Sequence, residues 1–273
     1  IHKLKAALDN DGNIVAWDQH VACQSLMGKQ GELDETSVEG AREVPYQFKH
    51  HRCMSYNTSS KVPVLWWRSV GHTHTGYTVE AFIDELLEKG SKDPIEGRLA
   101  LMQPGSRDAG VLRTVAKMAE EAGPVASNAA RGVAVHKSFS TYVAQIAEVT
   151  RNQNGEPNVT RVWVAVDCGV AVNPNHIKAQ VEGGVGFGVG AILYDEVVLS
   201  EGGTVEQSNF HDYRSLRMSE MPHVEVTVIQ SDASPTGVGE PGVPPIGPAV
   251  ANAWRRLTGE STYRLPMVKA AQA

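Results

Sequence analysis

The chain has 273 residues, with 25 Lys and Arg against 31 Asp and Glu, so its formal net charge is −6. This balance excludes the basic surface by which nucleic-acid-binding proteins are recognised. Three scattered cysteines are too few for a disulfide framework or a zinc site, and the apolar runs fall well short of the ~20 residues of a membrane span. The length is that of one large or two medium domains.

The chain begins with two strand-like runs, 4–9 and 14–22, which flank an Asp11-Gly12 turn and predict a hairpin. It opens at Ile1 without an initiator methionine and enters this hairpin at once, so we expect it to be part of a longer polypeptide. Residues 25–60 are polar and aperiodic, and they are predicted to form a long loop.

One strand and three helices are predicted next. The apolar run Val62–Trp67 predicts a strand. Apolar residues recur at helical spacing over residues 77–89, and Gly90 ends this first helix. Asp93 is predicted to cap a second helix, and a third spans about 108–122.

Residues 123–131 mark the predicted boundary between two α+β portions, residues 1–125 and 126–273. Beyond this boundary, alternating runs at 132–149 and 159–167 predict a long hairpin. A glycine-rich helix, a strand pair and a final loop and helix follow. This order predicts an α+β fold, with mixed sheets and packed helices, rather than alternating βαβ units.

An unusual loop near the C-terminal end carries Glu240. The run Gly237-Val238-Gly239-Glu240-Pro241 places one carboxylate among residues with very little side chain, and further prolines on both sides constrain the backbone. A rigid loop with few side chains suits a site where a bulky cofactor approaches the backbone and one catalytic base points towards the cofactor. A surface turn with a solvated glutamate is the alternative.

The segment after Gln180 is rich in glycine, with five glycines at positions 183–190. Each costs roughly 1 kcal/mol against alanine inside a helix, so about 4–5 kcal/mol of helix propensity is lost. Either a ligand or another backbone approaches closely, with Gln180 offering its amide, or the helix packs tightly against a neighbour. A nicotinamide-binding loop is a weaker interpretation, because the preceding strand ends near Asp167 and no βαβ context is recognised.

Arg68 ends the apolar run and is followed by small residues, so its guanidinium either faces an anion or a polar cofactor or forms a salt bridge at the strand end. His72 and His74 would share one strand face, and His50-His51 would point to opposite faces. Neither pair has a third ligand nearby, so no metal-ligating side chains are predicted. Nucleophile-elbow, phosphate-loop and Cys-X-X-Cys motifs are absent from the sequence.

Four ordered blocks carry a resemblance to a known family. From about Val64 onward, the chain resembles the molybdenum-binding subunit of the xanthine dehydrogenase/aldehyde oxidase family, in the branch of the isoquinoline 1-oxidoreductase β-subunit. The resemblance implies the C-terminal part of a molybdenum hydroxylase large subunit. The blocks are Trp67–Gly71 with Glu80–Leu86 behind it, Asp167–Gly169 with Val172–Pro174, Gln180–Gly184, and Gly237–Pro241.

Roles for individual residues are implied by this resemblance. Glu240 matches the catalytic glutamate of the family, and Val70 stands in the substrate pocket where xanthine-oxidising relatives carry a stacking phenylalanine, so purine specificity is not expected. The Gly-Gln-Gly and Gly-Gly-Phe-Gly elements of the family's cofactor cradle are missing from this chain. The implied cofactor-binding residues are Arg68, Gln180, Gly183, Gly184, Gly237, Val238 and Gly239.

The resemblance also implies a reaction and its components. An N-heteroaromatic compound or an aldehyde would be hydroxylated with water as oxygen source and Glu240 as general base. The cofactors would be molybdopterin in its cytosine dinucleotide form, with molybdenum, and 2Fe-2S clusters in a partner. The expected partners are a complementary N-terminal half, a small iron–sulfur subunit and a cytochrome or flavin acceptor, in the periplasm by family analogy. The alternative is a scaffold module of the same fold that binds no molybdenum.

Overall fold

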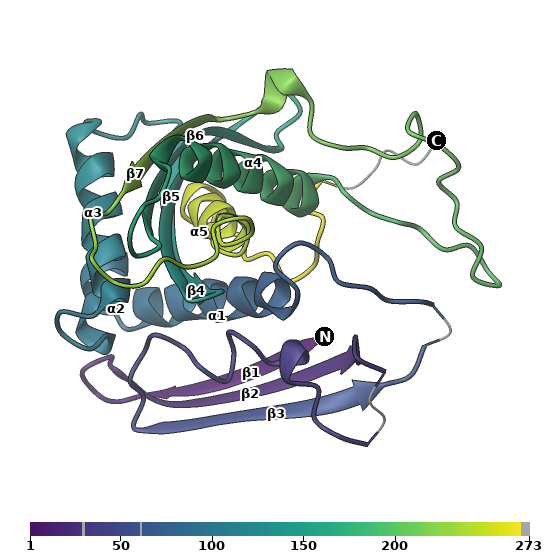
Figure 1. Ribbon diagram of the computed structural model, residues 1–273, viewed down its shortest axis with the longest axis horizontal. Helices are drawn as coiled ribbons and strands as arrows, with labels where there is room; N and C mark the ends of the chain where they lie inside the picture. The colour runs from purple at the N-terminus through teal and green to yellow at the C-terminus, as the bar shows by residue number, and fades with distance from the viewer. Residues whose placement is uncertain (29–30, 61, 269–273) are drawn as a thin grey trace.

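The computed structural model describes residues 1–28, 31–60 and 62–268, and these residues form two β-sheets with helices packed around them (Figure 1). The first sheet has the order β1-β2-β3. β1 is antiparallel to β2, whereas β3 is parallel to it. The three strands are His2–Leu8, Ile14–Gln24 and His50–Thr58.

The second sheet has the order β4-β5-β6-β7, and its pairs are antiparallel except for the parallel pair β6–β7. Its strands are Ala129–Ser138, Thr141–Arg151, Pro157–Asp167 and His223–Val228. The α-helices are α1 (Gly71–Lys89), α2 (Pro94–Leu101), α3 (Arg107–Glu121), α4 (Pro174–Leu193) and α5 (Ile246–Thr258), and two short 3-10 helices are η1 (Glu35–Ser37) and η2 (Met218–Glu220). None of the helices in the described residues is long and apolar enough to cross a bilayer.

β5 lies inside the second sheet, and its side chains alternate between two apolar cores, as the two-residue period of a strand requires. Val143 and Ala147 belong to a core with α4 and α5, whereas Ala144 and Ile146 belong to a core with α1 and α3. Figure 1 shows α4 and α5 on one face of this sheet and α3 on the other. The second core includes residues from both sides of residue 125, and the division into two portions stays a prediction.

The predicted fold class, α+β with mixed sheets and packed helices, is confirmed. The second helix begins as predicted, because the Asp93 carboxylate accepts the amide protons of Ile95 and Glu96 at 2.8 and 2.9 Å. The third helix, the glycine-rich helix and the last helix also lie where the sequence predicts them. The last helix ends at Gly259, which has a φ of 82°.

One loop prediction and two strand predictions are wrong. Residues 50–58 lie inside the predicted loop but form β3. Most side chains of this strand are exposed on both faces, so its sequence lacks the alternation of apolar and polar residues that marks a half-buried strand. The apolar run 62–67 is irregular rather than a strand, and Leu65 is 84% exposed. The long strand predicted over 132–149 is two strands, joined at Phe139 and Ser140 with φ values of 50° and 61°.

The first helix begins at Gly71, six residues before the predicted start at residue 77. His72 and His74 therefore lie on a helix and not on a strand face. His74 Nδ1 lies 2.9 Å from His2 Nε2. Within the described residues, no three His, Cys, Asp or Glu side chains are grouped so that they could hold a metal ion.

The expectation that no βαβ context surrounds the glycine-rich helix is also wrong, since β6 and β7 are parallel and α4 lies between them in the chain. The glycines nevertheless do not form a phosphate-binding turn. α4 begins at Pro174, and Gly183 lies more than two turns inside it. A nicotinamide loop needs its glycines at the helix N-terminus, so this interpretation fails on position.

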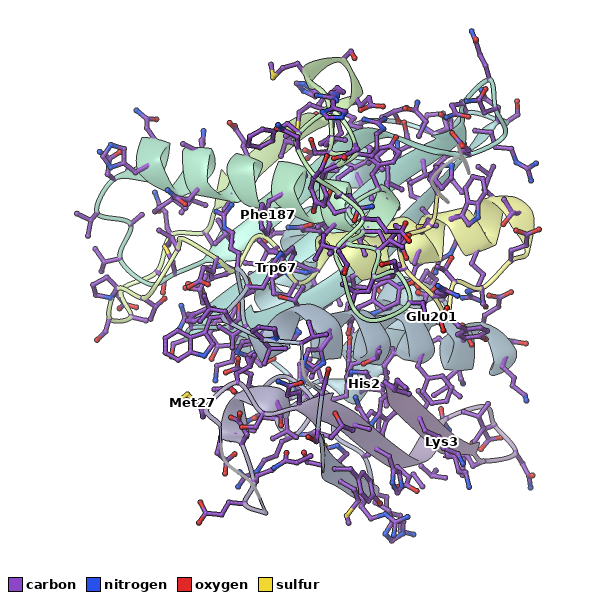
Figure 2. All side chains as sticks on the ribbon, turned by 90° about the vertical axis from the view of Figure 1, so that its right-hand side faces the viewer. His2, Lys3, Met27, Trp67, Phe187 and Glu201 are labelled. Atoms are coloured by element: carbon purple, nitrogen blue, oxygen red, sulfur yellow. The ribbon has the colours of Figure 1, made fainter. Side chains whose placement is uncertain are left out.

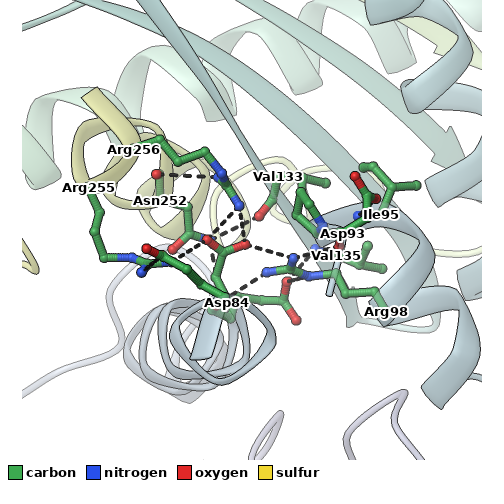
Figure 3. A network of polar contacts seen from close by, with 12 residues as sticks. Asp84, Asp93, Ile95, Arg98, Val133, Val135, Asn252, Arg255 and Arg256 are labelled. Carbon is green, nitrogen blue, oxygen red and sulfur yellow. Dashed lines mark hydrogen bonds and ion pairs between the residues drawn. The ribbon is translucent and has the colours of Figure 1, made fainter. Parts of the chain in front are cut away.

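Asp84 of α1 is the centre of a buried ion network (Figure 3). Its carboxylate accepts hydrogen bonds from Arg98 Nη1 at 2.8 Å, Arg255 Nη2 at 2.8 Å and Arg256 Nη2 at 2.7 Å. Burial raises the pKa of Asp84, but the charges of Arg98 and Arg256 outweigh burial, so the pKa lies below its ordinary value. The network holds α1 against α5. α1 follows the segment that contains Arg68, and α5 follows the loop that contains Glu240.

A buried pair of neutral histidines predicts a loss of stability in mild acid. His72 Nδ1 lies 2.8 Å from His136 Nε2. Burial lowers the pKa of His72 to about 4 and the pKa of His136 to about 3. Because both histidines titrate near 6.5 in the unfolded chain, the unfolded state binds more protons below that pH. Folding stability is therefore expected to fall from pH 6.5 towards pH 4, by about 2 kcal/mol per histidine at pH 5.

Urea unfolding at pH 7.5 and pH 5.0 measures this effect. His136→Gln should reduce the difference between the two pH values, because one acid-sensitive group is removed. His211→Gln, at a side chain that is 78% exposed, is the control and should leave the difference unchanged. A His136→Gln protein with the full pH dependence would contradict the assignment.

Candidate functional site

Arg68 joins two segments that are far away in the sequence. Its Nε donates to the Gly239 carbonyl oxygen at 3.0 Å, and its Nη2 donates to Gln180 Oε1 at 3.2 Å. Its guanidinium carbon also lies 5.6 Å from the centre of the Phe187 ring on α4. The structure therefore brings Arg68, Gln180 and Gly239 together, as the sequence predicts for three residues of one site.

Glu240 is held by the residue after Arg68. The backbone N–H of Ser69 donates to Glu240 Oε1 at 2.8 Å, and the Ser69 hydroxyl donates to the Glu240 carbonyl oxygen at 2.8 Å. Glu240 is partly buried, whereas Ser69 is completely buried. The two hydrogen bonds fix both the side chain and the backbone of Glu240, so this carboxylate is not that of a freely solvated surface turn.

The backbone that holds Glu240 is strained. Ser69 and Val70 have φ values of 78° and 49°, in the region that L-residues rarely adopt. A β-branched residue such as Val70 is a clear outlier there, and each such residue costs about 1–3 kcal/mol. The Val70 N–H donates to the Trp67 carbonyl at 2.7 Å, which closes a tight turn. Strain of this kind persists only where several contacts determine the backbone together.

Two glycines bring α4 against the Glu240 loop. A Cβ added at Gly184 would lie 3.2 Å from backbone atoms of Gly242, and one added at Gly242 would lie 3.1 Å from the Val181 carbonyl oxygen. Gln145, completely buried, donates to the Gly242 carbonyl at 2.8 Å. Tight packing therefore explains Gly184, and its predicted contact with a cofactor stays a prediction.

Gly183 lies on another face of α4. Among the described residues, no heavy atom beyond the helix's own neighbouring backbone lies within 4 Å of a Cβ built on it. Within the same part of the chain, a Cβ on Gly239 would meet only Gln180 Oε1, at 3.9 Å. The surface beside Glu240 is therefore bare where Gly183 and Gly239 lie, and a flat group can approach the backbone there.

The first residues of the loop are held by the second sheet. Thr141 Oγ1 donates to the Gly237 carbonyl oxygen at 2.6 Å. The Phe139 Cβ would lie 3.4 Å from a Cβ on Gly237. Val238 packs its side chain against the core that contains α4 and α5.

Two cavities lie on either side of the segment that precedes α1, and the residues that line them include neither Gln180 nor Glu240. One is apolar, has a volume of about 580 Å³ and is lined by Val70, Trp67 and residues of α1, α4 and α5. Figure 2 shows Trp67 close to Phe187, and their ring centres are 4.5 Å apart. The other cavity has a volume of about 420 Å³, and its lining is mostly polar and includes Glu39 and His72. Val70, the predicted substrate-pocket residue, lies beside the first cavity.

Sequence reasoning missed Glu39, a second carboxylate near Glu240. Burial raises the pKa of Glu39. Hydrogen bonds from the amides of Gly71 and His72 lower that pKa, whereas the negative charge of Glu240 raises it further, and the net pKa lies above its ordinary value. Glu39 Oε1 accepts the Gly71 N–H at 2.9 Å. Glu39 lies within the polar run 25–60, where neither period nor motif distinguishes it from its neighbours.

These residues fit a molybdopterin in two respects. Gln180, an exposed residue, and the backbone of residues 237–239 provide polar groups for the edge of a pterin. Gly183 and Gly239 leave the space that a planar ring system requires, whereas Gly237 is packed against Phe139. The guanidinium of Arg68 holds Gly239 next to Gln180, so the side chain of Arg68 supports the site rather than facing a ligand directly.

Comparisons with known proteins agree with this fit. Residues 98–222 match the family model of the molybdopterin cofactor-binding domain, a range that includes Gln180 but neither Arg68 nor Glu240. The β-subunit of isoquinoline 1-oxidoreductase from Brevundimonas diminuta is 32% identical over 96% of this chain and 35% of its own length. A nicotinate dehydrogenase subunit of Pseudomonas putida is 29% identical over 97% of this chain and 25% of its own length.

Solved structures share the fold. Quinoline 2-oxidoreductase from Pseudomonas putida 86 matches with a TM-score of 0.82 at 11% identity, over 98% of this chain and 60% of that one. The aldehyde oxidoreductase from Desulfovibrio gigas matches with a TM-score of 0.77 at 13% identity, over 98% of this chain and 48% of that one.

The family model and the fold define the class, a protein with a molybdopterin cofactor-binding domain. The chain belongs to the xanthine dehydrogenase/aldehyde oxidase family, among relatives of the isoquinoline 1-oxidoreductase β-subunit. The chain spans 35% and 25% of the length of these two curated relatives.

Proposed function

We propose that this chain is the part of a molybdenum hydroxylase that carries the catalytic base, and that the enzyme oxidises an N-heteroaromatic compound or an aldehyde. The observation that carries the proposal is that Arg68 joins Gln180 to Gly239, while the next residue, Ser69, binds the Glu240 carboxylate. The printed names of the relatives, which include an isoquinoline oxidoreductase and a nicotinate dehydrogenase, support the substrate class.

Molybdopterin, in its cytosine dinucleotide form, is the proposed cofactor. Gln180 and Gly183 of α4 and the backbone of Gly237, Val238 and Gly239 would hold it, with Arg68 keeping the two segments in place. When bound, the cofactor would supply the centre that accepts the hydride, two electrons with one proton, from the C–H bond that breaks as the new C–O bond forms. All other steps that concern this chain are acid–base chemistry and positioning.

Glu240 is proposed to act as general base. Its Oε1 is engaged by the Ser69 N–H, so its orientation is fixed before substrate binds. Its Oε2 is then the oxygen that takes the proton from the water-derived hydroxyl, as this hydroxyl attacks the electron-poor carbon of the substrate. The side chain of Val70 limits the space for the substrate and supplies no aromatic ring for stacking.

The remaining components lie outside this chain. We propose a complementary N-terminal portion of the large, molybdopterin-binding chain, a small subunit with 2Fe-2S clusters, and a cytochrome or flavin as electron acceptor. Both whole-chain relatives are named as single subunits of their enzymes, which supports an assembly of several chains. A periplasmic location is proposed from family analogy alone.

Isotope labelling of the assembled complex tests this function. Turnover of an N-heteroaromatic compound or an aldehyde in ¹⁸O-labelled water should place the label in the product, as mass spectrometry would detect. Stoichiometric molybdenum is expected in the same sample. A complex that contains no molybdenum would instead support the scaffold alternative, and an unlabelled product would exclude water as the oxygen source.

A further inference from the structure

The N-terminus of α1 depends on a carboxylate from a distant segment. Val70 occupies the N-cap position, and its side chain has no atom that can accept a hydrogen bond. The Gly71 N–H instead donates to Glu39 Oε1 at 2.9 Å. The negative charge of Glu39 also lies at the positive end of the helix dipole. Glu39 therefore does the work of a cap, although it is 32 residues away in sequence.

Glu39 is itself held against this helix end. The Thr75 hydroxyl of α1 donates to the Glu39 carbonyl oxygen at 2.6 Å. A Cβ added at Gly71 would lie 1.8 Å from the Thr36 carbonyl oxygen, so the backbone around Glu39 lies directly on the start of α1. His72 Nε2 lies 3.6 Å from Glu39 Oε2. These contacts leave the carboxylate little freedom.

The strained residues Ser69 and Val70 lie between two carboxylates. On one side the Ser69 N–H and hydroxyl bind Glu240, and on the other side the Gly71 N–H binds Glu39. Positive φ values at non-glycine residues are kept only while both ends of the turn are held. If the contact with Glu39 is lost, the turn can relax, and the amide that orients Glu240 moves with it.

We propose that Glu39 is a positioning residue, which holds the Ser69–Val70 turn and through it orients the Glu240 carboxylate. The turnover part of this inference rests on the proposed function, because it concerns the base of that reaction. The structural part of the inference, that the Ser69–Val70 turn depends on Glu39, is independent of the proposed function.

Amide hydrogen exchange and steady-state kinetics on the assembled complex test the proposal. In Glu39→Ala, the amides of residues 69–71 should exchange on the order of tenfold faster, because a hydrogen bond to a charged acceptor is lost. kcat should fall by about tenfold or more with little change in KM, since the base is misplaced rather than the substrate site removed. Glu39→Gln keeps an oxygen acceptor for Gly71 and should restore most of both properties.

Glu43→Ala is the matched control, since Glu43 lies exposed in the same segment. It should leave exchange and kcat unchanged. Unchanged exchange at residues 69–71 in Glu39→Ala would overturn the proposal. Rapid exchange in Glu39→Gln would overturn it as well, and this variant remains informative if Glu39→Ala does not fold. Exchange needs no turnover, so a complex that fails the oxygen-labelling test still tests Glu39.

Discussion

Replacing Glu240 by glutamine is expected to lower kcat by about 10²–10⁴-fold, the range in which a positioned general base contributes. Glutamine keeps an oxygen that can accept the Ser69 N–H, so the loop should retain its path. It has no carboxylate to take up a proton. The molybdenum content of the assembled complex should stay at the wild-type value. Steady-state kinetics, together with metal analysis of the same preparation, measure both quantities.

Glu182→Gln is the control for this prediction, because it removes an exposed carboxylate from α4, two residues from Gln180. It should leave kcat within about twofold of wild type. Ordinary turnover in Glu240→Gln would remove this residue from the mechanism. Loss of molybdenum from that variant would mean that Glu240 maintains the cofactor site rather than the proton transfer.

The second large effect is expected at Asp84. Asp84→Asn removes the negative charge that Arg98, Arg255 and Arg256 share at close range. Arg98 keeps its ion pair with Glu80 and Arg255 keeps its ion pair with Glu88, but each loses the carboxylate at the centre of the network. Removal of one partner from a buried ion pair typically costs about 3–5 kcal/mol. The free energy of unfolding from urea titration at pH 7 should fall by that amount. The loss should shrink at low pH, because the lowered pKa of Asp84 stabilises the fold only while the carboxylate is ionised.

Glu120→Gln serves as the comparison for Asp84→Asn, since Glu120 is an exposed acid on α3. A surface change of this kind should alter the free energy of unfolding by less than about 0.5 kcal/mol. If Asp84→Asn proved equally mild, the arginines would have to find other partners or solvent, and the network would not hold α1 and α5 together.

The helices could be predicted where their caps are local. Asp93 and Gly259 lie next to the helix ends that they define, so the sequence predicts both. The start of α1 could not be predicted, because its capping carboxylate belongs to a segment about 30 residues earlier. The turn at Phe139 and Ser140 was missed because neither residue is a glycine or asparagine.

The pattern of apolar residues gave wrong strand predictions where apolar side chains are exposed or where a strand consists of polar residues. The run Val62–Trp67 suggests a buried strand, yet the structure leaves Leu65 and Trp66 largely exposed. β3 has the reverse problem, because its polar residues pair through the backbone, and their side chains do not reveal a strand.

The candidate site was predicted largely by family resemblance. Arg68, Gln180, Gly239 and Glu240 are connected in the structure as one group. Ser69, whose amide and hydroxyl hold Glu240, lies in the Trp67–Gly71 block, but no role was predicted for it. Glu39 was missed because it lies outside all four blocks. Contacts across 171 sequence positions depend on the fold, and spacing along the chain does not reveal them.

The same separation has a consequence for biosynthesis. Arg68 and Ser69 leave the ribosome 171 residues before Gly239 and Glu240, the residues that they respectively bind, which at ordinary rates of translation is about 10–30 s. During that interval Trp66 and Trp67 have no completed loop beside them, and a nascent chain offers aromatic surface that chaperones recognise. The contacts that fix the Arg68–Ser69 segment against Gly239 and Glu240 can therefore form only after residue 240 has been synthesised.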